Sequence, residues 1–320
     1  MKSNNAIPIL RSIIAPEALA LLVETAYGIK VLRLQLIKAF ILDTYRVWTS
    51  QGLYILRIYP HQRRTLPEIN AELDFVSFLH NQDIRVSHPV LQASGDRLLV
   101  VDAPEGERYA ALFTYAQGQP LGEDMKAFRV YGSTLARIHT LSDTLPQSSA
   151  RYARDIACLL DRPLACLSRF ELRREDWDFL QRVAAVIAPQ ITALTTEPPY
   201  YGYCHGDASS DNAHVDAEGG VTLFDFDFCG PGWRAYDVGA FLSTERSEAA
   251  EEALLAGYDS VRRLTNEEKS ALPLFKIAQT IWMLGIRASY INEWGDIYFA
   301  DGFIDHIVGY VRTIFETVKW

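Results

Sequence analysis

The segment His205–Asn212, read His-Gly-Asp-Ala-Ser-Ser-Asp-Asn, is the feature that most constrains what this chain can fold into. Thirteen residues after Asn212, an apolar run ends at Asp225, the first residue of Asp-Phe-Asp. This layout places one carboxylate beside a hydroxyl acceptor and two oxygen ligands beside the phosphates of a nucleotide. Phosphoryl transfer needs these parts, because charge on the transferring group must be neutralised and the acceptor oxygen must be oriented in line.

Each polar residue of the motif has a separate expected role. Asp207 would accept or orient the proton of the substrate hydroxyl, and Asn212 and Asp225 would hold Mg²⁺ through oxygen. The alternative is a surface loop in which the Asp and Asn side chains only stabilise turns. That alternative is reasonable for any one of these residues, but the joint spacing favours the catalytic interpretation.

At these residues the sequence resembles the aminoglycoside phosphotransferase and choline kinase-like superfamily, which includes homoserine kinase-like members. The protein-kinase loop reads His-Arg-Asp-x4-Asn and its metal motif Asp-Phe-Gly, where this chain has Asp-Phe-Asp. The resemblance implies an α+β, two-lobed protein-kinase-like fold. Its N-lobe would be β-rich with one inserted helix, and its C-lobe would be mainly helical. We place the nucleotide-binding lobe at 1–116 and the catalytic and substrate-binding lobe at 117–320.

The hydrophobic pattern agrees with this order of elements. Apolar spacing and a Pro start predict a helix over 16–27 that Gly28 ends, and a second amphipathic helix over 67–81. The predicted strands are 31–41, 44–49, 53–59, 97–101, 109–114 and 221–224. After Gln117-Gly118-Gln119-Pro120 the pattern is mainly helical to the end, apart from the short strands around the catalytic motif.

The resemblance also assigns two residues of the N-lobe. In the family, a basic residue of the third strand reaches the phosphates and pairs with a helix glutamate, and here Arg57 and Glu72 occupy those positions. Taken singly, each could be an exposed polar residue. Arg57 departs from the usual Lys, because a planar fork and a point charge grip phosphate differently. A second departure is that the segment 37–44, where a phosphate-covering loop is expected, contains no glycine.

The interlobe segment is expected at Phe113, Thr114, Tyr115 and Ala116. Its backbone N–H and C=O groups would hydrogen-bond an adenine edge, and apolar side chains would sandwich the ring. The same residues could form an ordinary connection between lobes, and the two interpretations are compatible. ATP is the expected cofactor together with Mg²⁺, and GTP is not excluded.

Further residues are candidates for support or for substrate binding. The resemblance implies that His205 and Asp237 support the catalytic loop. Asp237 could equally be a carboxylate favoured at the start of a helix. Asp227 would be either a further metal ligand or, as we favour, a partner that supports the metal ligands, and it is also a candidate substrate contact. The carboxyl-terminal part offers Arg287, Glu293, Asp296 and Asp301 as substrate-binding candidates. These carboxylates suit a cationic substrate, whereas Arg287 suits a carboxylate, and all could be solvated surface charges.

Composition sets the remaining expectations. The net charge of −9 over 320 residues disfavours nucleic acid as a partner. No targeting segment and no membrane span are expected, and the four cysteines show no CxxC pair, so we expect a cytoplasmic protein with reduced thiols. The predicted function is Mg-dependent phosphorylation of a small molecule: an amino alcohol, an amino sugar or a hydroxy amino acid. The alternatives are a serine/threonine protein kinase of the same fold and a non-catalytic nucleotide-binding module. The oligomeric state stays open.

Overall fold

The chain divides into two compact units in a computed structural model. The structure describes residues 7–145, 150–170, 172–245, 247–295, 299 and 302–318. The first unit comprises the chain up to Asn81 together with Val86–Ala116. The second comprises Gln82–Arg85 and the chain from Gln117 onward.

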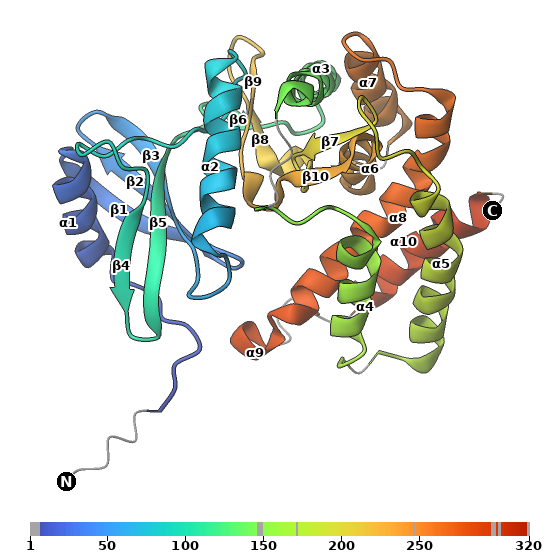
Figure 1. Cartoon of the computed structure of the whole chain (residues 1–320), viewed down its shortest axis with the longest axis horizontal. Coiled ribbons are helices and arrows are strands. Elements are labelled where there is room, and N and C mark those ends of the chain that lie inside the picture. The colour runs from blue at the N-terminus through green and yellow to red at the C-terminus, as the bar shows by residue number, and fades with distance from the viewer. Residues whose placement is uncertain are drawn as a thin grey trace. The chain divides into compact units, whose positions relative to one another are not determined.

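The first unit is a five-stranded antiparallel sheet with a helix on each face. The strands follow one another in the order β1-β2-β3-β5-β4. Figure 1 shows α1 and α2 on either side of this sheet. The elements are α1 (Pro16–Tyr27), β1 (Val31–Ala39), β2 (Asp43–Thr49), β3 (Gly52–Ile58), α2 (Leu66–Asn81), β4 (Leu99–Ala103) and β5 (Gly106–Thr114).

Alternation along the strands separates the two faces of this sheet, because successive side chains of a strand point to opposite sides. On β5, Ala110 and Leu112 belong to the core that α1 closes. Their neighbours Ala111 and Phe113 belong to the smaller core that α2 closes with Ile69 and Leu73. The residues of β3 alternate in the same way, so that Arg57 lies on the α2 side between two residues of the α1 core.

The predicted elements of this unit are found, but three strands have bounds that are wrong by two or more residues. Strand β5 begins at Gly106 instead of residue 109. The first strand ends at Ala39 instead of residue 41, because Ala39 already pairs with Asp43 and the residues between them form the turn. The fourth strand is β4, two residues later than predicted. Its buried positions are Leu99, Val101 and Ala103, so the polar residue Asp102 lies on the exposed side and does not end the strand.

The second unit is mainly helical and contains two small antiparallel sheets. One pairs β7 with β10, and the other has the order β6-β8-β9. The strands are β6 (Gln119–Pro120), β7 (Tyr201–Cys204), β8 (Ala213–Val215), β9 (Val221–Leu223) and β10 (Gly230–Trp233). The α-helices are α3 (Met125–Leu141), α4 (Arg162–Leu167), α5 (Arg174–Thr192), α6 (Arg234–Thr244), α7 (Glu248–Asp259), α8 (Asn266–Ser289), α9 (Ile291–Trp294) and α10 (Phe303–Thr317).

Helix packing builds the core of the second unit behind its small strands. Helix α3 packs on α7, and the long helix α8 packs on both α6 and α4 (Figure 1). Helix α6 is buried over ten of its eleven residues, from Arg234 to Ser243. A π-helical turn, Ala157–Asp161, runs directly into α4. Within the described residues, none of the helices combines the length and the apolar character that crossing a membrane requires.

The fold is therefore protein-kinase-like, as predicted: a β-rich N-lobe with one helix inserted between its third and fourth strands, and a mainly helical C-lobe. Between the Asp-Phe-Asp turn and the next helix, Gly230–Trp233 form β10, whose residues pair with β7 from Gly230↔Cys204 to Trp233↔Tyr201, and the helix starts at Arg234.

Candidate active site

The catalytic loop of the second unit lies between strand β7 and the hairpin of β8 and β9. Strand β7 ends at Cys204 and delivers His205–Asp207. A 3₁₀ turn, Ser210–Asn212, then leads into the β8–β9 hairpin. The backbone N–H of Phe224 donates to the carbonyl of Asn212 at 3.0 Å. This bond holds the end of the loop next to the end of β9, where Asp225 follows.

Two backbone features fix the loop against the Asp-Phe-Asp turn. Gly206 has φ +83°, and a Cβ atom there would lie 1.9 Å from the carbonyl oxygen of Phe228. Only glycine permits this approach. Asp225 itself is left-handed, with φ 65° and ψ 58°, a conformation that costs energy for most residues and that Asp and Asn tolerate best. Strain at Asp225, two residues past the end of β9, is typical of a functional position.

Asp207 and Asn212 meet through side chain and backbone. The amide nitrogen of Asn212 donates to the backbone carbonyl of Asp207 at 2.8 Å and to its Oδ2 at 3.2 Å. Since the nitrogen is used on Asp207, the amide oxygen of Asn212 is the atom that can ligate a cation. Burial raises the pKa of Asp207, and the neighbouring carboxylate of Asp225 raises it further. Two acidic groups thus lie close enough to repel, an arrangement that a divalent cation would relieve.

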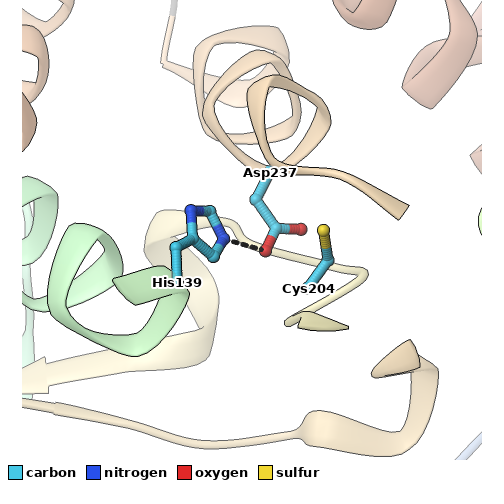
Figure 2. Close-up of side chains that lie close together, drawn as sticks. All are labelled: His139, Cys204 and Asp237. Carbon is cyan, nitrogen blue, oxygen red and sulfur yellow. Dashed lines mark hydrogen bonds and ion pairs between the residues drawn. The ribbon is translucent and has the colours of Figure 1, made fainter. Parts of the chain in front are cut away.

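Asp237 of α6 holds the start of the catalytic loop. Its Oδ2 accepts the backbone N–H of His205 at 2.6 Å, and its Oδ1 accepts that of Gly206 at 2.9 Å. His139 of α3 lies beside the same carboxylate (Figure 2), with Nε2 at 3.0 Å from Oδ2. Burial alone would raise the pKa of Asp237, but the hydrogen bond from His139 and the charges and donors around it lower it below its ordinary value.

The hydrogen-bond network assigns the neutral state of His139. Arg262 donates to the hydroxyl of Tyr258 at 3.0 Å, and that hydroxyl lies 2.7 Å from Nδ1 of His139. Nδ1 therefore accepts a hydrogen bond from the Tyr258 hydroxyl, and Nε2 carries the ring proton and donates a hydrogen bond to Asp237. Burial lowers the pKa of His139 to about 4. The ring is a neutral link between α3, α6 and α7.

His139, Cys204 and Asp237 bring three potential metal-binding atoms within 4.8 Å of one another. Their chemistry nevertheless fits a packed core. The carboxylate already accepts three hydrogen bonds. Burial raises the pKa of the Cys204 thiol well above its usual value, and a metal ligand must be a thiolate. We assign these residues to the packed interior that holds the start of the loop.

His205 supports the loop from within. Its Nε2 lies 3.0 Å from the carbonyl of Phe224, and its Nδ1 accepts the backbone N–H of Asp207 at 3.3 Å. Its ring packs on Phe226 with centroids 4.2 Å apart. One side chain therefore joins the catalytic loop to both sides of Asp225.

In the first unit, Arg57 and Glu72 form the predicted pair. Nη1 of Arg57 donates to Oε1 of Glu72 at 2.8 Å, and both side chains are buried. The hydroxyl of Tyr59 donates to the other carboxylate oxygen at 3.1 Å. The guanidinium also lies over the ring of Phe113, 5.2 Å from its centroid. Glu72 and two aromatic rings thus fix the direction of the Arg57 fork.

The glycine-free turn between β1 and β2 is held by charged side chains. Arg11 donates to the carbonyl of Phe40 and to the carboxylate of Asp43. Arg108 donates to the other oxygen of Asp43, and the Arg108 and Asp43 side chains are fully buried. Ion pairs to Asp43 therefore hold this turn in place, and its shape does not depend on glycine.

At the end of β5, the structure narrows the predicted adenine contact. The backbone N–H of Thr114 donates to the carbonyl of His88 at 2.9 Å. The carbonyl of Thr114 accepts the hydroxyl of Ser87. Because its N–H is used inside the unit, Thr114 does not offer that group to a nucleotide. Phe113 is buried under α2, and Tyr115 and Ala116 follow the strand.

The predicted substrate residues lie in different surroundings. Asp227 is 1% exposed, and its carbonyl accepts a hydrogen bond from Arg151, so it is an interior residue of the turn. The guanidinium of Arg287 lies over the ring of Phe303, 4.6 Å from its centroid. Glu293 is part of the short helix α9, and the rings of Tyr290 and Trp294, which flank it in the sequence, stack on each other. Asp296 and Asp301 lie outside the described residues.

Sequence reasoning missed three residues that form a row of hydrogen bonds ending at Asp207. Gln279 of α8 donates from Nε2 to Oδ1 of Asp207 at 3.1 Å. Tyr236 of α6 contacts Gln279, and Arg154 contacts Tyr236. No local motif marks them, because they come from three distant segments that only packing brings together.

Comparison with known proteins agrees with this geometry. The sequence profile described as "Phosphotransferase enzyme family" (APH) matches residues 34–270. The chain belongs to this family. The predicted membership and the prediction of a phosphotransferase are thereby confirmed. An uncharacterized protein of Synechocystis sp. is 35% identical over 298 residues, which cover 91% of this chain and 82% of that protein. A homoserine kinase of Rhizobium meliloti is 28% identical over 255 residues, covering 72% and 71%.

Solved structures share the fold. A microcompartment-associated aminopropanol kinase has a TM-score of 0.77 at 24% identity, covering 93% of this chain and 95% of its own. The amicoumacin kinase hAmiN, in complex with AMP-PNP, Ca²⁺ and Ami, has a TM-score of 0.79 at 18% identity, covering 95% and 94%. At these identities the likeness confirms the protein-kinase-like fold.

Proposed function

We propose that this protein transfers the γ-phosphoryl group of ATP, with Mg²⁺, to a hydroxyl of a small amine-bearing molecule: an amino alcohol, an amino sugar or a hydroxy amino acid. The observation that carries the proposal is the contact of Asn212 with both the backbone and the carboxylate of Asp207, next to Asp225. In this proposal Asp207 acts as the base, and Asn212 and Asp225 offer oxygen to a metal.

Mg²⁺ fits the donor set of this site. An amide oxygen and a carboxylate are hard oxygen ligands of the kind that Mg²⁺ prefers. The carboxylate of Asp225 also lies close enough to Asp207 to raise its pKa, so the site has negative charge to offset. Bound there, Mg²⁺ would neutralise the phosphate oxygens during transfer. We assign Asn212 and Asp225 as its ligands.

Asp207 orients the acceptor. Two side-chain amides hold its carboxylate, Gln279 at one oxygen and Asn212 at the other. A carboxylate fixed in this way can accept the proton of an alcohol without first changing its rotamer. Positioning of the reacting groups in this manner is a main contribution of the protein to phosphoryl transfer. Asp237 and His139 act at a distance from the reacting atoms by holding the backbone of the loop.

The first unit supplies the nucleotide site in this proposal, and the second supplies catalysis and acceptor binding, with the boundary at residues 116 and 117. Arg57, held by Glu72, contacts the phosphates as a two-pronged donor. Complexes of related structures with AMP-PNP, ADP and AMP support an adenine nucleotide. All four cysteines are free thiols, which supports a cytoplasmic location.

The acceptor class is proposed from the relatives and from the carboxyl-terminal side chains. Proteins named as aminopropanol kinase and homoserine kinase act on small molecules that carry an amine and a hydroxyl. Glu293 offers a carboxylate to such an amine. Arg287 offers a cation to a carboxylate, which a hydroxy amino acid would add.

A panel of acceptors tests the proposal. The protein is incubated with γ-³²P-ATP and Mg²⁺ and with 1-amino-2-propanol, ethanolamine, choline, L-homoserine, L-serine or an aminoglycoside, beside casein as a protein acceptor. We expect labelling of at least one small alcohol, and none when EDTA replaces Mg²⁺. Labelling of casein with every small alcohol inert would contradict the proposal and identify a protein kinase. Absence of transfer to any acceptor, with ATP still bound, would indicate a non-catalytic module.

A further inference from the structure

A chain of hydrogen bonds runs from a buried arginine to the catalytic carboxylate of the second unit. Nη2 of Arg154 donates to the hydroxyl of Tyr236 at 2.6 Å. That hydroxyl donates to Oε1 of Gln279. Nε2 of Gln279 donates to Oδ1 of Asp207 at 3.1 Å. The chain therefore has a cation at one end and the proposed base at the other.

Proton counting gives the chain one direction. Arg154 can only donate, and the Tyr236 hydroxyl has a single proton. Because the hydroxyl accepts from Arg154, its own proton has two acceptors in reach, the carbonyl of Gly206 at 3.3 Å and Gln279 at a shorter distance. The shorter contact takes the proton, so Oε1 of the amide faces Tyr236. The amide nitrogen then has to face Asp207. The orientation of Gln279 is thus set by Tyr236 and Arg154.

The surroundings hold this chain rigid. Arg154, Tyr236 and Gln279 are 3%, 0% and 2% exposed. The guanidinium of Arg154 lies over the ring of Trp282, 4.3 Å from its centroid, and also donates to the carbonyl of Gly206 at 2.8 Å. Tyr236 packs edge-on against Phe275. Aligned hydrogen bonds in such an interior polarise and strengthen one another.

We infer that Gln279 is a positioning residue for phosphoryl transfer: together with Asn212 it fixes the rotamer of Asp207, and Tyr236 and Arg154 fix Gln279. This inference rests on the proposed function only for its kinetic consequence. Asn212 holds Oδ2 from within the loop, whereas Gln279 holds Oδ1 from α8, so the carboxylate is gripped at both oxygens. Loss of one grip lets the carboxylate rotate away from the acceptor hydroxyl.

Two near-isosteric variants separate positioning from support of the fold. Gln279→Glu keeps the oxygen that accepts from Tyr236 but replaces the donor to Asp207 with an acceptor. Tyr236→Phe removes one oxygen atom. The amide donor of Gln279 is kept, but the hydroxyl that sets the orientation of this amide is lost. Gln190→Glu is the matched control, because Gln190 lies on the surface of α5 and bonds only within its own helix.

Kinetics with Mg-ATP and the panel alcohol that the wild type labels fastest give the first readout. For Gln279→Glu we expect kcat to fall on the order of 10- to 100-fold, the effect of a misplaced catalytic group. The KM values for Mg-ATP and alcohol should stay within roughly threefold of the wild type, because this contact is made to the base and not to either ligand. Tyr236→Phe should lower kcat less. The double variant should equal Gln279→Glu, because the two residues act in series.

Crystal structures of the wild type and of Gln279→Glu give a second readout that needs no turnover. We expect the Asp207 carboxylate in one rotamer in the wild type, and rotated or divided between rotamers in the variant. Failure of the wild type to phosphorylate any alcohol would count against the proposed function, while this comparison would still decide the role of Gln279. An unmoved Asp207, a kcat equal to that of Gln190→Glu, or additive losses in the double variant would each overturn the inference.

Discussion

Replacement of Asp237 by alanine would leave three buried donors without an acceptor. They are the backbone N–H groups of His205 and Gly206 and the Nε2–H of His139, all now within 3.0 Å of the carboxylate. Each unsatisfied buried donor costs about 1–3 kcal/mol. Because the three bonds share one carboxylate and their losses are not fully additive, we expect the free energy of unfolding to fall by about 4 kcal/mol.

Urea unfolding followed by tryptophan fluorescence measures this change. Five of the six tryptophans, at positions 177, 233, 282, 294 and 320, belong to the second unit, so the signal reports mainly on the unit that contains Asp237. Asp178→Ala is the control. Its carboxylate is half exposed on α5 and pairs only with Arg174, and such pairs contribute about 0–1 kcal/mol. A loss below about 1 kcal/mol for Asp237→Ala would refute the claim that this carboxylate holds the loop.

Three further predictions concern the metal, the nucleotide and pH. Asp225→Asn keeps a residue that tolerates the left-handed backbone but removes the negative charge. The affinity for Mg-ATP, measured by titration calorimetry, should therefore fall at least tenfold, while the affinity for metal-free ATP changes little. An unchanged affinity for Mg-ATP would show that Asp225 is not a metal ligand. Arg57→Ala and Glu72→Ala should each raise the KM for ATP. The free-energy change for the double variant should be smaller than the sum of the two single changes, because each residue acts through the other. Strict additivity would show that the two residues work separately. The pKa of His139 is about 4 in the folded protein, below its value of 6.5 in the unfolded chain. Between these two pH values the unfolded chain binds a proton that the folded protein does not bind. The free energy of unfolding therefore falls as the pH drops from about 6.5 toward 4, by about 3 kcal/mol in total. Denaturant unfolding across that window should show a shallower decline for His139→Gln, and parallel curves would disprove the assignment.

Local chemistry explains which elements the sequence could predict. Helix α1 has the predicted bounds, because Pro16 occupies its first turn and Gly28 ends it in the left-handed conformation at φ 65°. The contact between Asp207 and Asn212 follows from their spacing in one loop. The pairing of Arg57 with Glu72 follows from strand alternation and from a helix packed on one face of the sheet.

Other parts of the site depend on packing that no short pattern encodes. Gln279 contacts Asp207 across 72 positions of sequence, because α8 packs on α6 behind the catalytic loop. The same packing buries Arg154 and Tyr236. The shift of β4 has a simpler cause: a polar residue at an exposed strand position looks like a strand end when only the sequence is considered. Substrate residues are hardest to predict, because charges near a carboxyl terminus suit solvent as well as ligands.

The most direct test of the central claim is single-turnover transfer from γ-³²P-ATP, with Mg²⁺, by the wild type and by Asp207→Asn, using the panel alcohol that the wild type labels fastest. Asparagine keeps the size of the side chain but cannot accept the proton of the alcohol. We predict that transfer slows roughly 10²- to 10⁴-fold, while the Mg-ATP affinity stays within about threefold, since the base is not a nucleotide contact. Transfer within tenfold of the wild type would contradict the assignment of Asp207 as the catalytic base, and with it the account of this site.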